Sequence, residues 1–174
     1  MNPVGGRILG TLLSVDGRGV VRMNDRLEAG IDDVWSALTD PARLARWLGE
    51  FEGDLRLGGE YRARYHASGW EGVGRVEAFE PPRHLLALTK DADDEDGAFD
   101  PDHAFEVTLT GDHDGTGIVW EERGMPAELL APYGAAIQVH VEDLASYLAG
   151  GERCDATTRF EELLPAYRDL AASA

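Results

Sequence analysis

The sequence predicts an α+β fold in which a curved antiparallel β-sheet wraps around one long C-terminal helix. Apolar and polar side chains alternate through much of the chain up to about residue 123, as expected for β-strands. This alternation is interrupted by helical spacing at residues 31–48, and helical spacing returns at residues 132–148. Strands joined by short turns, without intervening helices, favour an antiparallel meander over βαβ units.

The first strand region, residues 7–27, contains the tight-turn pair Asp16-Gly17, which favours a hairpin. Two short helices should follow. Asp40 is placed to cap the second of them, which begins at Pro41. The apolar face of the first helix consists of Ile31, Val34, Trp35 and Leu38, and that of the second consists of Leu44, Trp47 and Leu48. We interpret the two tryptophans as core residues that close one end of the space between sheet and long helix.

Strand patterns resume after these helices and continue to about Arg123. One strand contains Gly72 and Gly74, which indicate a bend or the close approach of another segment. The long helix, residues 132–148, should stop before Gly150-Gly151. Its apolar stripe consists of Ile137, Val141, Leu144 and Leu148.

These boundaries predict a domain of residues 1–150 and a helical tail of residues 151–174. The tail has apolar residues at helical spacing and is expected to pack on the domain or on a second copy, which would make a homodimer possible. Pro165 lies inside this pattern. Because proline lacks a backbone N–H, we expect it to break or kink the tail helix.

The chain has 174 residues and a formal net charge of −17, so binding to nucleic acid or to an anionic membrane is disfavoured. No stretch reaches the length of about 18 apolar residues that a membrane span needs. The N-terminal residues lack the pattern of a signal peptide, so we expect a cytoplasmic protein. Cys154 is the single cysteine, which excludes an internal disulfide.

Motifs for phosphate, dinucleotide or serine-hydrolase chemistry are absent from the sequence. The histidines do not have the spacing of metal ligands, so no metal and no cofactor is expected. The acidic loop 91–102 partly resembles a calcium loop through Asp91, Asp93 and Glu95. However, Asp96 stands where such a loop needs glycine, and a solvated loop is favoured. Cys154 is interpreted as a surface thiol rather than a nucleophile.

Glu122 and His140 are the candidate catalytic residues. If Ile118 and Trp120 point inward on the strand at 117–123, Glu122 does too, whereas the alternative face would present Val119, Glu121 and Arg123. A carboxyl group beside apolar surface should have a raised pKa and could act as an acid or base. If a ligand occupies the space between the sheet and the long helix, the residues expected to contact it are Tyr65, Trp70, Phe105, Trp120, Glu122, Ile137, His140, Val141 and Leu144.

Several phrases, in this order, resemble one known family: "IDDVWSALTDPARLARWL", "GDLRLGGEYRARY", "GVGRVEAFEPPRHL", "GTGIVWEERGMP" and "LASYLAG". They are similar to homologues of the activator of the ninety-kilodalton heat-shock chaperone's ATPase, a branch of the START-like (SRPBCC) superfamily with its helix-grip fold. The resemblance covers Leu27 to Gly150. This family usually begins its last helix with a Gly-Trp pair, where this chain has Ala136 and Ile137.

The resemblance implies a cavity between sheet and long helix that holds a small hydrophobic or amphipathic molecule. Ligand binding is therefore the first hypothesis. Catalysis of the cyclase, aromatase or hydrolase kind is the second, with Glu122 and His140 as its residues. A chaperone-linked or homodimeric interaction protein is the third. Chaperone activation itself is not expected, because the eukaryotic activator carries a separate docking domain for which 174 residues leave no room.

Overall fold

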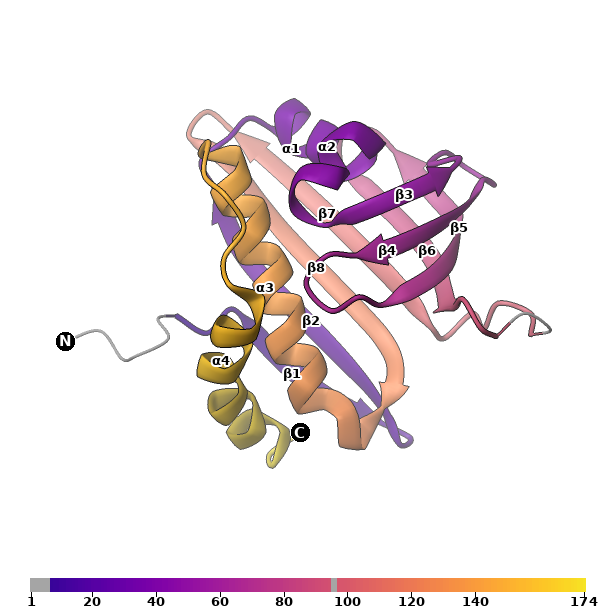
Figure 1. Cartoon of the computed structure of the whole chain (residues 1–174), viewed down its shortest axis with the longest axis vertical. Coiled ribbons are helices and arrows are strands. Elements are labelled where there is room, and N and C mark those ends of the chain that lie inside the picture. The colour runs from indigo at the N-terminus through magenta and orange to yellow at the C-terminus, as the bar shows by residue number, and fades with distance from the viewer. Residues whose placement is uncertain (1–6, 95–96) are drawn as a thin grey trace.

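The computed structural model describes residues 7–94 and 97–174, and within these ranges one eight-stranded antiparallel sheet curves around a long helix (Figure 1). The strands are β1 (Gly10–Val15), β2 (Arg18–Leu27), β3 (Gly49–Gly53), β4 (Glu60–Tyr65), β5 (Glu71–Glu80), β6 (His84–Asp91), β7 (Ala104–Asp112) and β8 (Gly115–Pro126). The helices are α1 (Ile31–Thr39), α2 (Pro41–Trp47), the 3₁₀ helix η1 (Ala127–Leu129), α3 (Leu130–Leu148) and α4 (Ala156–Ala171). The predicted helix-grip fold is thereby confirmed.

The strand order is β1-β2-β8-β7-β6-β5-β4-β3, so β2, from the start of the chain, pairs with the last strand, β8. The hairpin between β1 and β2 turns at Asp16 and Gly17, whose φ values of 52° and 79° are both positive. Two consecutive positive φ angles are what a two-residue hairpin turn requires. The remaining strands form the predicted meander, which runs from β3 at one edge to β8.

Helices α1 and α2 cover one end of the concave face, beside the end of α3 (Figure 1). The Asp40 side chain accepts a hydrogen bond from the amide of Ala42 at 3.0 Å and caps α2, with Pro41 in its first turn as predicted. Trp47 is buried, and its indole N–H donates to the carbonyl oxygen of Ala37 at 2.9 Å. Its ring packs edge-on against Trp120 with 6.2 Å between centroids. Trp47 therefore packs the end of α2 against strand β8.

Helix α3 lies across the concave face and begins at Leu130, two residues before the predicted start at Pro132. Its predicted stripe faces the sheet, because Ile137, Val141 and Leu144 are all buried. Helix α4 then returns alongside α3 (Figure 1).

Of the two effects expected of Pro165, a break is wrong, since α4 continues from Ala156 to Ala171 with Pro165 inside it, and a kink stays a prediction. Proline cannot donate to the carbonyl of residue 161, four positions earlier. Both Glu161 and Pro165 are exposed, so water can satisfy that carbonyl. Buried Leu163 and Tyr167 hold the helix on either side of the proline.

The tail helix is bound to its own chain by a buried polar cluster. The Tyr167 hydroxyl accepts a hydrogen bond from the amide of Gly10 at 3.1 Å and also donates to the side chain of Gln138. Arg159 makes two hydrogen bonds to the carboxylate of Glu142 on α3, at 2.7 and 2.8 Å. Of the two predicted arrangements, the structure therefore shows the tail packed on the domain. The boundary between residues 150 and 151 and the homodimer both stay predictions.

The convex face of the sheet carries a chain of alternating charges across four strands. Arg22 on β2 pairs with Glu121 at 2.6 Å, and Arg123 contacts Glu121 at 2.8 Å and Glu106 at 3.0 Å. His84 on β6 extends the chain, with its Nε2 atom 2.6 Å from Glu106. These contacts place Glu121 and Arg123 on the outer face of β8. In the described ranges, no helix is long and apolar enough to cross a membrane.

Candidate functional site

The structure decides which face of β8 points inward. Ile118 and Trp120 are buried in the core, 2% and 0% exposed, so Glu122 belongs to the concave face two residues further along. Phe105 of β7 is the register partner of Glu122 and lies on the same face. The first of the two predicted alternatives is therefore the observed one.

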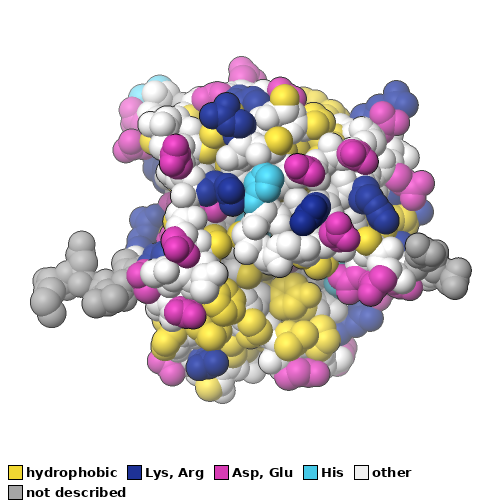
Figure 2. Space-filling view, viewed as in Figure 1, with side chains coloured by type: hydrophobic (Ala, Val, Ile, Leu, Met, Phe, Trp, Pro, Cys, Tyr) yellow, Lys and Arg dark blue, Asp and Glu magenta, His cyan; other side chains and the backbone are white. Residues whose placement is uncertain are grey.

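A cavity of about 380 Å³ lies between this part of the sheet and helix α3. Figure 2 shows hydrophobic side chains gathered in the lower half of the view, where α3, α4 and the end of β8 meet. Most of the cavity wall is aromatic or aliphatic, with a few polar groups. The lining residues are Tyr65, Ser68, Trp70, Thr89, Asp91, His103, Phe105, Glu122, Leu129, Pro132, Tyr133, Ala136, Ile137, His140 and Phe160.

Six of the nine predicted binding residues are brought together in this wall: Tyr65, Trp70, Phe105, Glu122, Ile137 and His140. The other three, Trp120, Val141 and Leu144, are 0% exposed and lie behind it. Trp120 supports the wall from below, because its ring packs against Phe105 at 5.0 Å and against His140 at 6.3 Å between centroids.

Glu122 presents a carboxyl group to the cavity. Burial raises its pKa to about 7, although a hydrogen bond from the indole N–H of Trp120, 2.9 Å long, acts in the opposite direction. Removal of a carboxylate from water favours its neutral form. Near neutral pH this group therefore exists in both forms and could donate or accept a proton.

His140 stands opposite, on α3, and is 4% exposed. Its ring packs edge-on against Tyr65, with 5.0 Å between centroids, and its Nδ1 atom has no hydrogen-bond partner in the described part of the chain. Burial lowers the pKa of His140 to about 4. The imidazole is thus neutral at pH 7, with one nitrogen able to donate and the other able to accept.

Sequence reasoning missed several lining residues. Tyr133 and Ala136 share the helical face of Ile137 and His140, so spacing along α3 could have identified both. Phe160 comes from α4, which lies outside the predicted cavity, and no local signal connects it to the site. The short cavity-facing side chain of Ala136 leaves room between α3 and the sheet.

Trp70 is held in place from two sides. Its indole N–H donates to the Asp91 carboxylate at 2.7 Å, and its ring lies directly on the backbone of Gly72. A Cβ atom at Gly72 would come within 1.9 Å of the Trp70 ring. The close approach predicted at Gly72 is therefore made by the ring of Trp70, which lines the cavity.

The acidic loop contributes Asp91 to the cavity, and its possible metal chemistry finds no support. The described residues contain no group of three side chains able to hold a metal ion. Glu95, which belonged to the partial calcium-loop pattern, and Asp96, which departed from it, lie outside the described residues.

A second hollow, of about 550 Å³, adjoins the cavity on the side of α4. The two hollows have four lining residues in common, Ser68, Ala136, His140 and Phe160. Phe160 on α4 therefore lies at the boundary between them. A ligand longer than the first cavity could extend past this ring toward Leu164.

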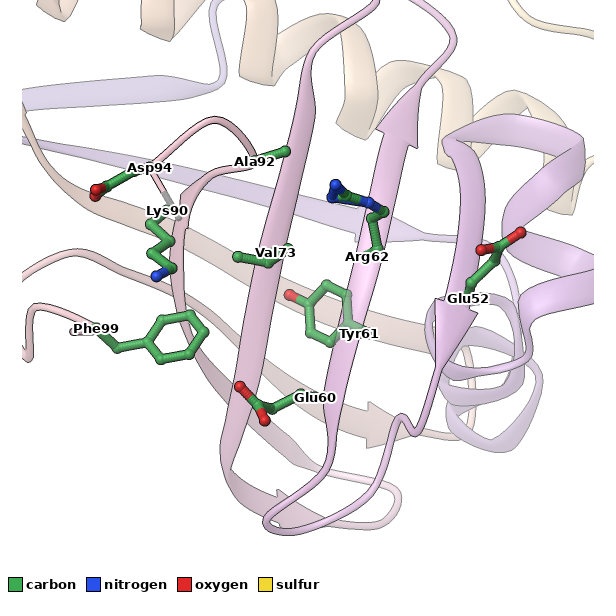
Figure 3. Close-up of a pocket in the computed structure, with 9 residues that line it drawn as sticks. All are labelled: Glu52, Glu60, Tyr61, Arg62, Val73, Lys90, Ala92, Asp94 and Phe99. Carbon is green, nitrogen blue, oxygen red and sulfur yellow. The ribbon is translucent and has the colours of Figure 1, made fainter. Parts of the chain in front are cut away.

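A third hollow has a different character (Figure 3). Its charged groups come largely from the convex face of the sheet, where Arg62 and Lys90 flank Val73 in the register of β4, β5 and β6. Lys90 donates a hydrogen bond to the carbonyl of Gly97, and its ammonium group lies 5.1 Å from the centroid of the Phe99 ring. The lysine is thus already used to hold the loop, and this hollow is a weaker candidate site.

Cys154 is an exposed residue whose thiol is partly buried. This partial burial and the nearby carboxylate of Asp143 raise the pKa of the thiol to about 12. The reactive thiolate is therefore almost absent at neutral pH.

The comparisons with known proteins agree with this architecture. CalU16 from Micromonospora echinospora is 26% identical, with a TM-score of 0.73 over 93% of this chain and 95% of that chain. DynU16, from the dynemicin biosynthetic locus, is 29% identical, with a TM-score of 0.67 over 78% of this chain and 50% of that chain. PFC0360w, an Hsp90 activator from Plasmodium falciparum, is 18% identical, with a TM-score of 0.52 over 62% of this chain and 74% of that chain, and shows the fold alone.

A comparison with curated proteins found no match. The family model described as Activator of Hsp90 ATPase homolog 1-like protein matches residues 28–149, which is well over half of the 174 residues. The chain therefore belongs to the Activator of Hsp90 ATPase homolog 1-like family, as its sequence phrases predicted.

Proposed function

We propose that this protein binds a small hydrophobic or amphipathic molecule in the cavity between the sheet and α3. The observation that carries the proposal is the cavity itself, about 380 Å³ in volume, with largely aromatic and aliphatic walls and polar lining groups that include Glu122 and His140. Binding sites for small molecules are typically clefts of about 300–1,000 Å³ with this kind of lining. DynU16 comes from a biosynthetic locus, and this supports a small metabolite as the ligand class.

Two residues of α3, Ala136 and Ile137, give further support. The family resemblance leads one to expect a Gly-Trp pair where this chain has Ala136 and Ile137, and both of these residues line the cavity. Isoleucine occupies less volume than tryptophan, so this chain leaves open space that an indole at position 137 would fill. Replacement of Ile137 by the tryptophan of the family pair should therefore fill this space, and it supplies a test.

Native mass spectrometry of the protein purified from its own cells tests the proposal. We expect a non-covalent mass that is released on denaturation of the wild type, and its loss in Ile137→Trp. The control is Leu13→Trp, which adds the same ring at a residue that is 56% exposed on β1. An Ile137→Trp variant that keeps the wild-type ligand at the same occupancy would contradict the proposed location. If the wild type is bare, titration with a hydrophobic fluorescent probe decides, and absence of a saturable site overturns the proposal.

Catalysis is a second candidate function, favoured by the presence of Glu122 and His140 in one cavity. Glu122 titrates near neutral pH, with a pKa of about 7, and His140 is a neutral imidazole that could donate or accept. A cavity that orients a reactive substrate needs few such groups. If the protein is an enzyme, Glu122→Gln and His140→Gln purified from the same cells should hold a molecule of different mass from the wild type, namely substrate instead of product. Identical bound masses in all three proteins argue for a binding protein.

A further inference from the structure

The charges around the cavity are of one sign. Asp91 and Glu122 line the main cavity, and Glu161 lines the adjoining hollow. Within the described part of the chain, no lysine or arginine lines either of them. Apart from the histidines, a bound anion would therefore lose its hydration without gaining a cationic partner, which is costly. A cation would meet two carboxyl groups.

The walls suit a cation as well. Five aromatic side chains line the main cavity: Tyr65, Trp70, Phe105, Tyr133 and Phe160. The faces of such rings attract ammonium groups, and this attraction grows when the cation is removed from water. Apolar walls alone would explain binding of a hydrocarbon, but they would not explain the carboxyl group of Glu122 in the cavity wall.

Among the described residues, Glu122 has no charged partner of its own. In the described ranges its one hydrogen bond comes from the neutral indole of Trp120, at 2.9 Å. Of the two histidines that line the cavity, His103 and His140, the latter is buried and neutral, and its Nδ1 atom has no hydrogen-bond partner among the described residues. By contrast, other carboxylates of this chain have arginine partners, as Glu121 does with Arg22 at 2.6 Å. The free carboxyl of Glu122 is thus available to a ligand.

We infer that the ligand of this cavity is a protonated amine on an aromatic or aliphatic body, with its ammonium group against Glu122 and between the aromatic rings. This inference rests on the proposed function and names the chemical class of its ligand. The amine would displace the carboxyl proton, so that a neutral acid in the empty protein becomes a carboxylate paired with an ammonium ion in the complex.

Proton release gives the inference a second signature. The titratable groups that line the cavity with Glu122, or influence it through space, are Asp91, His103, His140, Tyr65, Tyr133 and Tyr61. Because burial raises the pKa of Glu122 to about 7, most of the empty protein carries the proton there at pH 6. Binding of an amine at pH 6 should release up to one proton, whereas binding of an uncharged molecule should release none.

The test compares three probes that share one ring system and differ in charge: 2-naphthylmethylamine, 2-naphthalenemethanol and 2-naphthoic acid. Isothermal titration calorimetry at pH 6, in two buffers of different ionisation enthalpy, measures both affinity and proton release. We expect the amine to bind at least tenfold more tightly than the alcohol, and the acid to bind most weakly. In Glu122→Gln the affinity for the amine should fall about tenfold and proton release should vanish. Affinity for the alcohol should stay within twofold of the wild type.

Glu28→Gln is the matched control, because Glu28 is an exposed carboxylate that does not line the cavity, and it should behave as wild type. If the alcohol binds as tightly as the amine, or if the acid binds best, the inferred ligand class is wrong while the proposed function stands. If none of the three probes binds, both fail. An unchanged alcohol affinity in Glu122→Gln also shows that the variant is folded.

Discussion

Replacement of Glu122 by glutamine should make the protein more stable at high pH, and the size of this effect follows from the burial of the carboxyl group. Its pKa rises from an ordinary 4.5 to about 7 in the folded protein. Each pH unit of this difference corresponds to about 1.4 kcal/mol, so the total is at most about 3–4 kcal/mol. Glutamine can still accept the hydrogen bond from Trp120, so the variant removes the charge and keeps the contact.

The direction of the effect follows from the raised pKa. A group whose pKa is higher in the folded protein contributes stability that is fully present below pH 4.5 and is lost as the pH rises through 7. Between pH 5 and pH 8 the wild type should therefore lose about 2–3 kcal/mol relative to Glu122→Gln. Other titrating groups are the same in both proteins and cancel in this difference.

Urea unfolding at pH 5, 6, 7 and 8 measures the free energy of unfolding of each protein, with equal m-values as the sign that the folded state is unchanged. Glu28→Gln should show a difference from wild type that does not vary with pH, because this side chain is exposed. A Glu122→Gln difference that stays constant within about 0.5 kcal/mol across this range would refute the reasoning. It would mean that Glu122 is solvated and that the cavity does not hold a neutral carboxyl group.

Three further predictions concern other parts of the molecule. His84→Gln should destabilise the protein most below pH 6.5, because Glu106 and Glu80 raise the pKa of the imidazole in the folded protein. The stabilising contribution of His84 is lost as the pH rises through this raised pKa. Thermal unfolding of wild type and variant at pH 6 and pH 9 measures the effect, and equal losses of stability at both pH values would contradict the prediction. Tyr167→Phe should cost about 1–2 kcal/mol in urea unfolding, since it leaves buried polar partners unpaired, and a negligible loss would show that the cluster does not hold the tail. Alkylation of Cys154 by iodoacetamide at pH 8 should be at least tenfold slower in the native protein than in urea, because the thiol pKa is raised to about 12, and equal rates would refute that cause.

Elements with strong local signals were predicted well. The hairpin at Asp16-Gly17 and the cap at Asp40 before Pro41 depend on a few neighbouring residues, and the structure has both features at these positions. Pro165 shows the limit of such rules. The local rule gives the cost of the missing hydrogen bond correctly. The rule takes no account of tertiary structure. The helix is exposed at Pro165, and contacts with α3 and β1 hold it in place.

The inward face of β8 could not be chosen from the sequence, because each face of this strand carries a carboxylate, Glu121 on one and Glu122 on the other. What distinguishes them is the identity of their neighbours. Glu121 lies opposite Arg22 in the register of β2 and β8, two strands far apart in the sequence. The outer face thus satisfies its charges across strands, and the unpaired carboxyl remains inside. Only the pairing of β2 with β8 shows which of the two carboxylates has an arginine opposite it, and so which face of β8 points outward.

The exact lining of the cavity was less predictable than its place between the sheet and the long helix, and the reason is physical. Hydrophobic periodicity identifies the face of an element that is buried, but a cavity is a volume that the buried side chains fail to fill. Ile137 faces the cavity while Val141 and Leu144, on the same apolar stripe, are packed behind its wall. The difference between these residues depends on what stands opposite them, and part of that comes from Phe160 on a helix outside the matched family region. A sequence signal for the cavity would therefore have to combine a small residue on α3, such as Ala136, with unpaired polar groups on the facing strands, and Glu122 is such a group.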